Sequence, residues 1–347
     1  MTMSPRPGEP RPRGAHLVGS VPLSNSTEVF RTVGSILGHH LRRMPDGETG
    51  RRLRWNSWTA PSYERAPGLE LVEPPPGNYT PWKQVRLTID PDRLVLPRLG
   101  FADAAVASYA EFARLRTTGV VPEWCRFQVC LPSPVAPMIV LVEEGSRAAV
   151  EPAHLRRLFT ELDEILSVIP HDQLAVQWDV CQDVGIWEGY YPAYFDDPRE
   201  GVIERLAACA ARVPEPVELG FHLCYGDYGH RHFMAPRDLA VVTEMANRLR
   251  AAIARRIDWV HVPVPADRDD EAYFRPLEGL GLDPETELYL GLLHEEDGVE
   301  GAWRRIRAAR GFVRDFGVAT ECGLGRRPRE VVEPLLHLHA QVADPVA

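Results

Sequence analysis

The stretch VELGFHLCY, residues 217–225, is an apolar run that ends in a histidine, a cysteine and a tyrosine. Alternate residues of a β-strand point to the same side, so we expect His222 and Cys224 to share one face. The chain contains further short apolar runs with polar ends. We interpret each of them as a strand: 15–22, 41–45, 125–132, 173–180, 258–265, 287–294 and 317–323.

Segments with helical spacing lie between these runs. Their apolar residues recur every three or four positions, as in a helix that packs one face on a sheet. The clearest segments are 27–41, 154–169, 237–256 and 299–316. Eight strands alternating with helices predict an α/β protein with a single (β/α)8 TIM barrel. A doubly wound open sheet is the competing architecture, but no glycine-rich phosphate loop follows the first predicted strand.

Two segments depart from the alternation of strands and helices. Segment 46–100 is rich in proline, tryptophan and arginine and is longer than an ordinary loop. We interpret it as an insertion after the second strand, forming a lid over one end of the barrel. Segment 1–14 is rich in proline, arginine and glycine, which is typical of a disordered tail. The barrel domain is therefore predicted to span 15–343.

Composition limits the class of protein. The 347 residues are 44% hydrophobic and 25% charged, which is typical of a globular enzyme. A net charge of −10 argues against nucleic acid as a partner, because that binding needs a basic surface. No apolar stretch approaches the ~20 residues of a membrane-spanning helix, and the N-terminus lacks a secretory signal. Six cysteines are too few for a disulfide scaffold in this chain, so we expect a cytoplasmic protein.

Polar residues gather at the predicted strand ends. In a (β/α)8 barrel the carboxyl ends of the strands surround one site, so these residues are expected to converge. They are Gly19, Ser20, Asp46 to Glu48, Asp179, His222, Cys224, His261, His294 to Asp297, Glu321 and Cys322.

Imidazole and thiolate are ligands that zinc prefers, and a catalytic zinc keeps three protein ligands and one open position. His222 and Cys224 offer such ligands, and Cys322 ends the last predicted strand. The alternative is that these are ordinary core residues, since cysteine is among the most buried residue types.

The motifs HLVGS (16–20), GE (47–48), QWD (177–179), HLCY (222–225) and ECGLGRRP (321–328) occur in this order. Together they resemble the catalytic barrel of cobalamin-independent methionine synthase and its relatives, which include uroporphyrinogen decarboxylase. The resemblance covers about residues 15–340 and implies a (β/α)8 barrel with zinc held by His, Cys, Glu and Cys. By motif position, His222, Cys224 and Cys322 take three of these four roles.

The chain departs from this pattern at the fourth ligand. Pro263 stands where the family has its ligand glutamate. His261, two residues earlier on the same strand face, is a possible substitute, or it simply packs between Val260 and Val262. His230 and His232 are further candidates, or loop residues that line the mouth of the barrel.

The resemblance also implies a site for an amino-acid substrate. Gly19 and Ser20 match the family's contact to the substrate carboxylate, and Glu48 and Asp179 match the carboxylates that hold its ammonium group. Two carboxylates suit an ammonium, while hydroxyl and amide donors suit a carboxylate. The alternative for Glu48 is a solvated turn in PDGETG. Asp179 would end a buried strand, where an aspartate normally needs a partner or a function.

The folate-binding end of the family's site is poorly matched. The aliphatic stretch SPVAPMIVLVEE (133–144) stands where the family has a stacking tryptophan. HEED (294–297) stands where the family has its acid histidine. His294, Glu295 or Glu296 would supply proton transfer there, unless HEED is only the acidic start of a helix. Trp55, Trp58 and Trp82 form either a different lid or anchors of a small core.

We therefore predict a zinc-dependent transferase or lyase that resembles methionine synthase and acts on a small amino-acid or thiol substrate. Its reaction would be alkyl or methyl transfer to sulfur, or the making or breaking of a carbon–sulfur bond, without methyl-folate. The catalytic candidates are Asp179, His294 and Glu296. The first rival is a metal-free lyase like uroporphyrinogen decarboxylase, and the second is an iron or copper enzyme with oxidative chemistry. A non-catalytic binding protein is the third.

Overall fold

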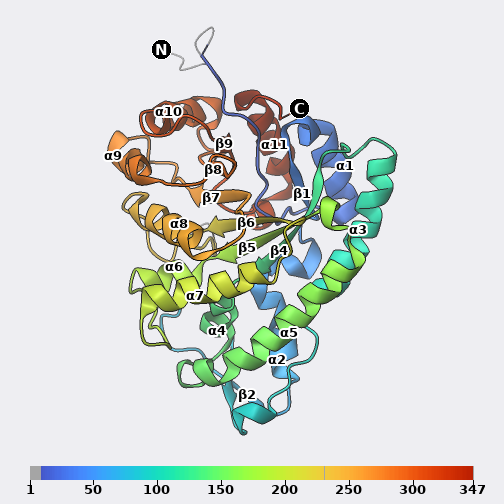
Figure 1. The fold of residues 1–347 in the computed structure, drawn as a ribbon, viewed down its shortest axis with the longest axis vertical. Coiled ribbons are helices and arrows are strands. Elements are labelled where there is room, and N and C mark those ends of the chain that lie inside the picture. Colours follow the sequence, from blue (N-terminus) through green and yellow to red (C-terminus); the bar gives the residue numbers. More distant parts are fainter. Residues whose placement is uncertain (1–8, 230, 347) are drawn as a thin grey trace.

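The computed structural model describes residues 9–229 and 231–346. Its main sheet has seven strands, and each pair of neighbours is parallel. The strands follow the order of the chain: β1 (Arg43–Pro45), β4 (Arg126–Pro132), β5 (Leu174–Val180), β6 (Glu218–Leu223), β7 (Trp259–Pro263), β8 (Glu287–Gly291) and β9 (Gly317–Val318). All seven lie within predicted strand segments. The sheet is curled, and the longer helices lie around its outside (Figure 1).

The predicted eighth strand is not found among the described residues, because the first predicted strand, 15–22, does not form a ladder of hydrogen bonds with a neighbouring strand. Ala15 forms isolated parallel bridges with Leu41 on one side and Val318 on the other. The N-terminal segment therefore touches both edges of the sheet without becoming a strand of it. The edge strands β1 and β9 are only three and two residues long, which leaves few partners for a regular pairing along 15–22.

The helices connect successive strands, as the alternating pattern predicts. Their bounds are α1 (Ser26–Leu37), α2 (Ala60–Glu64), α3 (Phe101–Thr117), α4 (Val135–Leu141), α5 (Arg147–Val168), α6 (Gln182–Trp187), α7 (Pro198–Ala211), α8 (Ala240–Ala252), α9 (Glu271–Phe274), α10 (Gly298–Arg310) and α11 (Val332–Val342). Short 3-10 helices are η1 (Gly38–His40), η2 (Gly50–Thr59), η3 (Pro91–Arg93), η4 (Glu144–Ser146), η5 (His171–Gln173), η6 (Arg275–Gly279), η7 (Leu324–Arg326) and η8 (Arg329–Val331). No described helix has the length and apolar character needed to cross a membrane.

The segment 46–100 has a structure of its own. It contains η2, α2, η3 and an antiparallel pair of strands, β2 (Leu69–Val72) and β3 (Gln84–Leu87). In Figure 1, α2 and β2 lie at the end of the molecule opposite the C-terminus. The division into tail, barrel and insertion stays a prediction. Of the predicted tail, residues 1–8 lie outside the described residues, while Gly14 donates a backbone hydrogen bond to Asp344.

The middle of the sheet is packed too tightly for a side chain at one position. A Cβ atom on Gly220 of β6 would lie 2.0 Å from the ring of Trp259 on β7. Glycine therefore lets the buried indole of Trp259 cross over β6. This close approach lies two residues before His222, so it helps to place the polar end of β6 beside that of β7.

Candidate metal and substrate site

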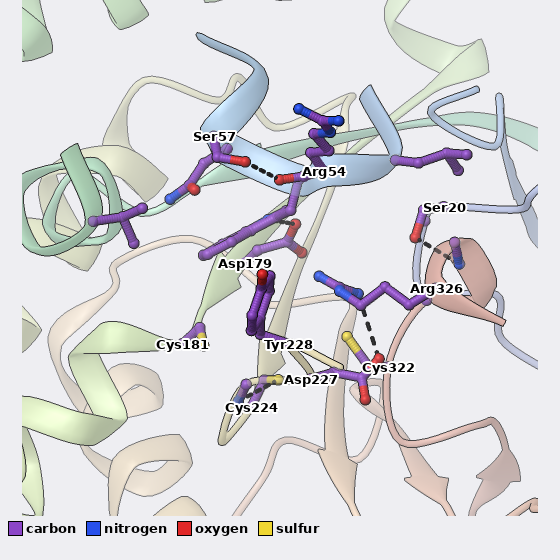
Figure 2. A pocket seen from close by; sticks show the side chains of 18 of the residues that line it. Ser20, Arg54, Ser57, Asp179, Cys181, Cys224, Asp227, Tyr228, Cys322 and Arg326 are labelled. Atoms are coloured by element: carbon purple, nitrogen blue, oxygen red, sulfur yellow. Dashed lines mark hydrogen bonds and ion pairs between the residues drawn. The ribbon is translucent and has the colours of Figure 1, made fainter. Parts of the chain in front are cut away.

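A cavity of about 460 Å³ opens where β5 and β6 end and where the chain leaves β9. The wall on the side of the sheet contains Asp179, His222, Cys224 and Cys322. Segment 46–100 supplies Glu48, Trp55, Tyr79 and Trp82 on other sides. Figure 2 shows side chains from these separate parts of the chain turned toward one space.

His222, Cys224 and Cys322 are brought together in this cavity. One nitrogen of His222 and the two sulfur atoms all lie within 4.8 Å of one another. The ligand atoms of a tetrahedral zinc are roughly 3.5–3.8 Å apart, given Zn–S and Zn–N bonds of about 2.3 and 2.0 Å. A small inward movement of the side chains would therefore suit such an ion. Among the described residues, this is the one group of three such side chains close enough to hold a metal ion.

His261 lies behind His222 and outside that group. Its Nε2 atom is 3.1 Å from the carbonyl oxygen of Thr320, which can only accept, so Nε2 carries the proton. Its Nδ1 atom lies 2.7 Å from Nδ1 of His222. Burial lowers the pKa of His261 to about 3, so the ring is neutral and its Nδ1 accepts the hydrogen of His222 Nδ1.

This chain of hydrogen bonds determines which nitrogen of His222 has a lone pair. Burial lowers the pKa of His222 well below its usual value, so this ring is also neutral. With the proton on Nδ1, the lone pair is on Nε2, a buried atom that makes no hydrogen bond with the described residues. Partners of this kind fix the tautomer and the ring orientation of metal-binding histidines. The arrangement fits His261 as a support for His222 rather than as a ligand.

A third cysteine, Cys181, lines the same cavity at the end of β5. A hydrogen bond with the Cys181 thiol, together with burial, raises the pKa of Cys224 well above its usual value. A hydrogen bond with Cys224 and burial do the same for the pKa of Cys322. The thiols of Cys224 and Cys322 are therefore protonated when no cation is bound to them. A metal ion deprotonates the thiols that coordinate it.

Asp179 ends β5 at the wall of the cavity, with both carboxylate oxygens engaged. Gln177 Nε2 donates to Oδ1 at 2.8 Å, and the indole nitrogen of Trp55 donates to Oδ2 at 2.9 Å. The partner that a buried aspartate needs is thus supplied partly by Trp55, in segment 46–100. Burial nevertheless raises the pKa of Asp179.

Glu48 lies close to the first predicted strand. A Cβ atom on Gly19 would be 3.1 Å from Glu48 Oε2, so the carboxylate packs against that glycine. The turn is held by Asp46, which accepts from the Glu48 amide at 2.8 Å and from Arg52 at 2.7 Å. Burial, followed by the charge of Asp179, raises the pKa of Glu48. No described residue donates a hydrogen bond to the Glu48 carboxylate, so this group is suited to an external cation.

Backbone strain is concentrated at the same place. Among the described residues, only Glu48 (φ 45°) and Trp55 (φ 52°) combine a side chain with positive φ. Such conformations cost on the order of 1–3 kcal/mol and persist where the surrounding structure imposes them. Both strained residues line the cavity, and Trp55 bonds directly to Asp179.

Ser20, by contrast, is partly occupied by the chain itself. Its hydroxyl accepts a hydrogen bond from the Gly325 amide at 3.2 Å, and its carbonyl accepts one from Leu324 at 2.7 Å. The hydroxyl proton has no acceptor among the described residues, so it can be donated to a ligand.

The proton-transfer candidates lie away from the cavity wall. His294 is buried and bonds through Nε2 to the Val264 carbonyl at 2.8 Å, and Glu296 is exposed; neither lines the cavity. HEED directly precedes α10, where Asp297 pairs with Arg305, as the helix-start alternative proposes. His232 lies 3.5 Å from Glu321, also outside the cavity wall, and His230 lies outside the described residues.

The three tryptophans of the insertion divide between the two roles considered for them. Trp55 and Trp82 line the cavity, while Trp58 is buried against Phe101 at a ring distance of 5.1 Å. Sequence reasoning missed Cys181 and Arg326, which also line the cavity. Cys181 follows the QWD motif and Arg326 lies within ECGLGRRP, so their proximity to motif residues was the available signal.

Comparison with known proteins agrees with the fold. No protein-family model matches the chain, and no curated protein matches it. A B12-independent methionine synthase structure from Shewanella sp. W3-18-1, in complex with selenomethionine, superimposes with a TM-score of 0.60 and 16% identity. The match covers 95% of this chain and 96% of that one. A putative vitamin-B12-independent methionine synthase from Listeria monocytogenes gives a TM-score of 0.57 and 14% identity over 96% and 98% of the two chains. At these identities the comparison shows a shared fold.

Proposed function

We propose that this protein is a zinc-dependent enzyme that transfers an alkyl or methyl group to the sulfur of a small amino-acid thiol, or makes or breaks a carbon–sulfur bond. The observation that carries the proposal is the grouping of His222, Cys224 and Cys322 within 4.8 Å in a cavity that also contains Glu48 and Asp179. The fold shared with methionine synthases supports the same reaction class.

The residues of the candidate metal site suit zinc. The buried Nε2 atom of His222 lacks a partner among the described residues, and the tautomer derived above leaves its lone pair available. Two thiolates and one imidazole form a typical ligand set for a catalytic zinc, which keeps a further position for a substrate. A bound zinc ion lowers the pKa of a substrate thiol, so that the thiolate exists at neutral pH.

The other side chains of the cavity would hold the amino-acid part of the substrate. Glu48 and Asp179 offer two carboxylates to an ammonium group, and Ser20 offers a hydroxyl donor to a carboxylate. The selenomethionine in the Shewanella structure supports an amino-acid ligand of this kind. The proton-transfer role proposed for His294 and Glu296 has less support, because neither lines the cavity.

The rival functions differ in their need for a metal. A metal-free lyase would work with carboxylates and arginines, and the cavity does contain Arg326 beside Glu48 and Asp179. An iron or copper centre would use additional histidines as ligands. In the structure, however, Nε2 of His261 is hydrogen-bonded to the Thr320 carbonyl and Nε2 of His294 to the Val264 carbonyl.

We also propose that the protein is cytoplasmic.

The test is the binding of a thiol at the metal. The protein is loaded with Co²⁺ in place of zinc, and its visible absorption is followed while L-homocysteine is added. We expect a change of the sulfur-to-cobalt absorption that L-norleucine, which lacks sulfur, does not produce. The same spectrum with both ligands, or a protein that holds no metal after loading, would reject the proposal in favour of the metal-free lyase.

A further inference from the structure

Arg326 is held inside the cavity by a loop that fits closely around Ser20. The amides of Leu324 and Gly325 donate to the carbonyl and the hydroxyl of Ser20, at 2.7 and 3.2 Å. Cβ atoms on Gly323 and Gly325 would lie 2.4 and 2.7 Å from the Ser20 hydroxyl oxygen. Only glycine allows this approach without displacement. The loop after β9, which carries Cys322 and Arg326, is therefore held against Ser20.

The Arg326 side chain points toward the middle of the site in Figure 2, between Cys322 and Asp179. It pairs with Asp227 at 3.4 Å, and the two side chains are only 22% and 18% exposed. That distance is longer than the 2.7–2.9 Å of a strong charged hydrogen bond, and the contact involves one nitrogen of the guanidinium fork. This pair is a weaker contact than the two-pronged one that a guanidinium can make with a carboxylate.

The charge of Arg326 reaches both carboxylates of the predicted ammonium site. It lowers the pKa of Glu48 and of Asp179, although burial outweighs it in both. The cation and the two carboxylates line the same cavity. An α-amino acid has its ammonium and its carboxylate on the same carbon atom, so it needs both charges in one cavity.

Ser20 alone is a weak partner for a buried carboxylate. It offers one hydroxyl donor, whereas a guanidinium offers five N–H groups in a planar fork. A carboxylate that leaves water without adequate partners is strongly destabilised. The simpler alternative is that Arg326 only offsets the negative charge of the cavity. Binding a carboxylate and offsetting the charge of the cavity can be told apart by which part of a ligand needs Arg326 in order to bind.

We propose that Arg326 binds the carboxylate of the substrate, opposite the ammonium site at Glu48 and Asp179. The substrate is then a free amino acid, with its carboxylate unmodified, rather than a peptide, an amide or a simple thiol. This inference rests on the proposed function and assigns it a recognition residue. Three contacts, with the metal group, the carboxylate pair and Arg326, would also select one enantiomer.

The experiment measures binding of three small thioethers to the zinc-loaded, full-length protein by calorimetry. The probes are L-methionine, 3-(methylthio)propylamine, which lacks the carboxylate, and 3-(methylthio)propanoate, which lacks the ammonium. They are compared on the wild type, Arg326→Gln, Arg326→Lys and Arg327→Gln. Arg327 is a matched control, because it pairs with Glu295 at 3.3 Å and does not line the cavity.

We expect Arg326→Gln to weaken the binding of L-methionine and of 3-(methylthio)propanoate by about 10–100-fold. This loss corresponds to the roughly 1.5–3 kcal/mol that a charged hydrogen bond contributes. Binding of the amine should stay the same or become tighter, because a positive neighbour is removed. Arg327→Gln should bind all three probes as the wild type does. Arg326→Lys should give an intermediate loss, since it keeps the charge and loses the fork.

Two results would overturn the inference. In the first, L-methionine binds the wild type and Arg326→Gln equally well. In the second, Arg326→Gln weakens the amine as much as L-methionine while its zinc content is unchanged. Failure of the proposed function looks different, because L-methionine then does not bind the wild type at all, and the inference fails with it.

Discussion

His222 and His261 meet through their Nδ1 atoms, 2.7 Å apart, and this contact determines how His222 faces the cavity. Because Thr320 takes the only hydrogen of the neutral His261 ring, His222 must donate from Nδ1 and keep its lone pair on Nε2. His261, which sequence reasoning offered as a substitute ligand, lies in the structure behind His222 and outside the group of three candidate ligands. We propose that its contact with His222 prepares that residue to bind a metal ion.

The first prediction concerns metal content. The purified protein should hold about one zinc ion per chain, because three ligand side chains are already grouped in the cavity. The double variant Cys224→Ser, Cys322→Ser should lose nearly all of it while remaining folded. Cys209→Ser is the matched control, since Cys209 is a buried cysteine that does not line the cavity, and this variant should keep its metal. Elemental analysis and circular dichroism measure both properties. Full metal content in the double variant would disprove the site.

The second prediction concerns the support of His222. His261→Ala should weaken zinc binding by about 10–100-fold, because the tautomer and the orientation of His222 are no longer fixed. Competition with a chromophoric chelator measures the affinity. His339→Ala is the control for losing a buried imidazole, since His339 bonds within α11 to Leu335 and lies outside the cavity wall. Equal affinity of the two variants would contradict the role of His261.

The third prediction concerns Glu48 and pH. Burial and the charge of Asp179 raise the pKa of Glu48 to about 8, and burial raises that of Asp179 to about 7. An ammonium group binds the ionised carboxylates, so the dissociation constant of L-methionine should fall as pH rises from 6 to 8. Glu48→Gln should weaken binding by about tenfold or more at pH 8 and flatten this dependence, because a charged partner is lost.

Metal content is the control for Glu48→Gln. We expect it to equal that of the wild type, because Glu48 is outside the ligand group. If the variant loses zinc instead, Glu48 is the missing fourth ligand and its proposed contact with the ammonium group is wrong.

The fourth prediction concerns the packing of β6. Gly220→Ala should destabilise the protein by about 1–3 kcal/mol, because its Cβ would lie 2.0 Å from the ring of Trp259. Gly145→Ala is the control, since nothing lies within 4 Å of a Cβ at that position. Urea unfolding of both variants gives the comparison. Equal midpoints would show that the sheet accommodates the methyl group by moving.

The fifth prediction concerns the alkyl donor: methyl-tetrahydrofolate should not serve. The aliphatic helix α4, from which Val140 lines the cavity, stands where the resemblance implies a stacking tryptophan. Stacking of this kind is worth about 1–3 kcal/mol if base-stacking values transfer. The resemblance also places Pro263 where the family has a ligand carboxylate, and a metal centre without that carboxylate would be more positive and a thiolate on it less reactive.

The assay for this prediction is direct. Zinc-loaded protein is incubated with methyl-tetrahydrofolate and L-homocysteine, and methionine is followed by mass spectrometry. We expect no turnover above about one per minute, which is slow against the ~10 per second of a median enzyme. Faster formation of methionine would identify a folate-dependent methionine synthase.

The sequence by itself determined the strands and most helices that build the site. Apolar runs and helical spacing are local properties, so β4 to β8 fall within the segments that they indicate. The strand ends also follow from the sequence, because polar residues replace apolar ones where a strand leaves the core. These strand ends predict that His222, Cys224 and Cys322 lie at one end of the sheet.

Only the tertiary structure decided which side chains meet there. Trp55 and Asp179 are 124 residues apart in the chain, and their hydrogen bond depends on how segment 46–100 packs against the ends of the strands. The isolated bridge between Ala15 and Val318 and the position of Arg326 likewise result from contacts between the two ends of the chain. Register, tautomer and ion pairing depend on such long-range packing, which no short window of sequence contains.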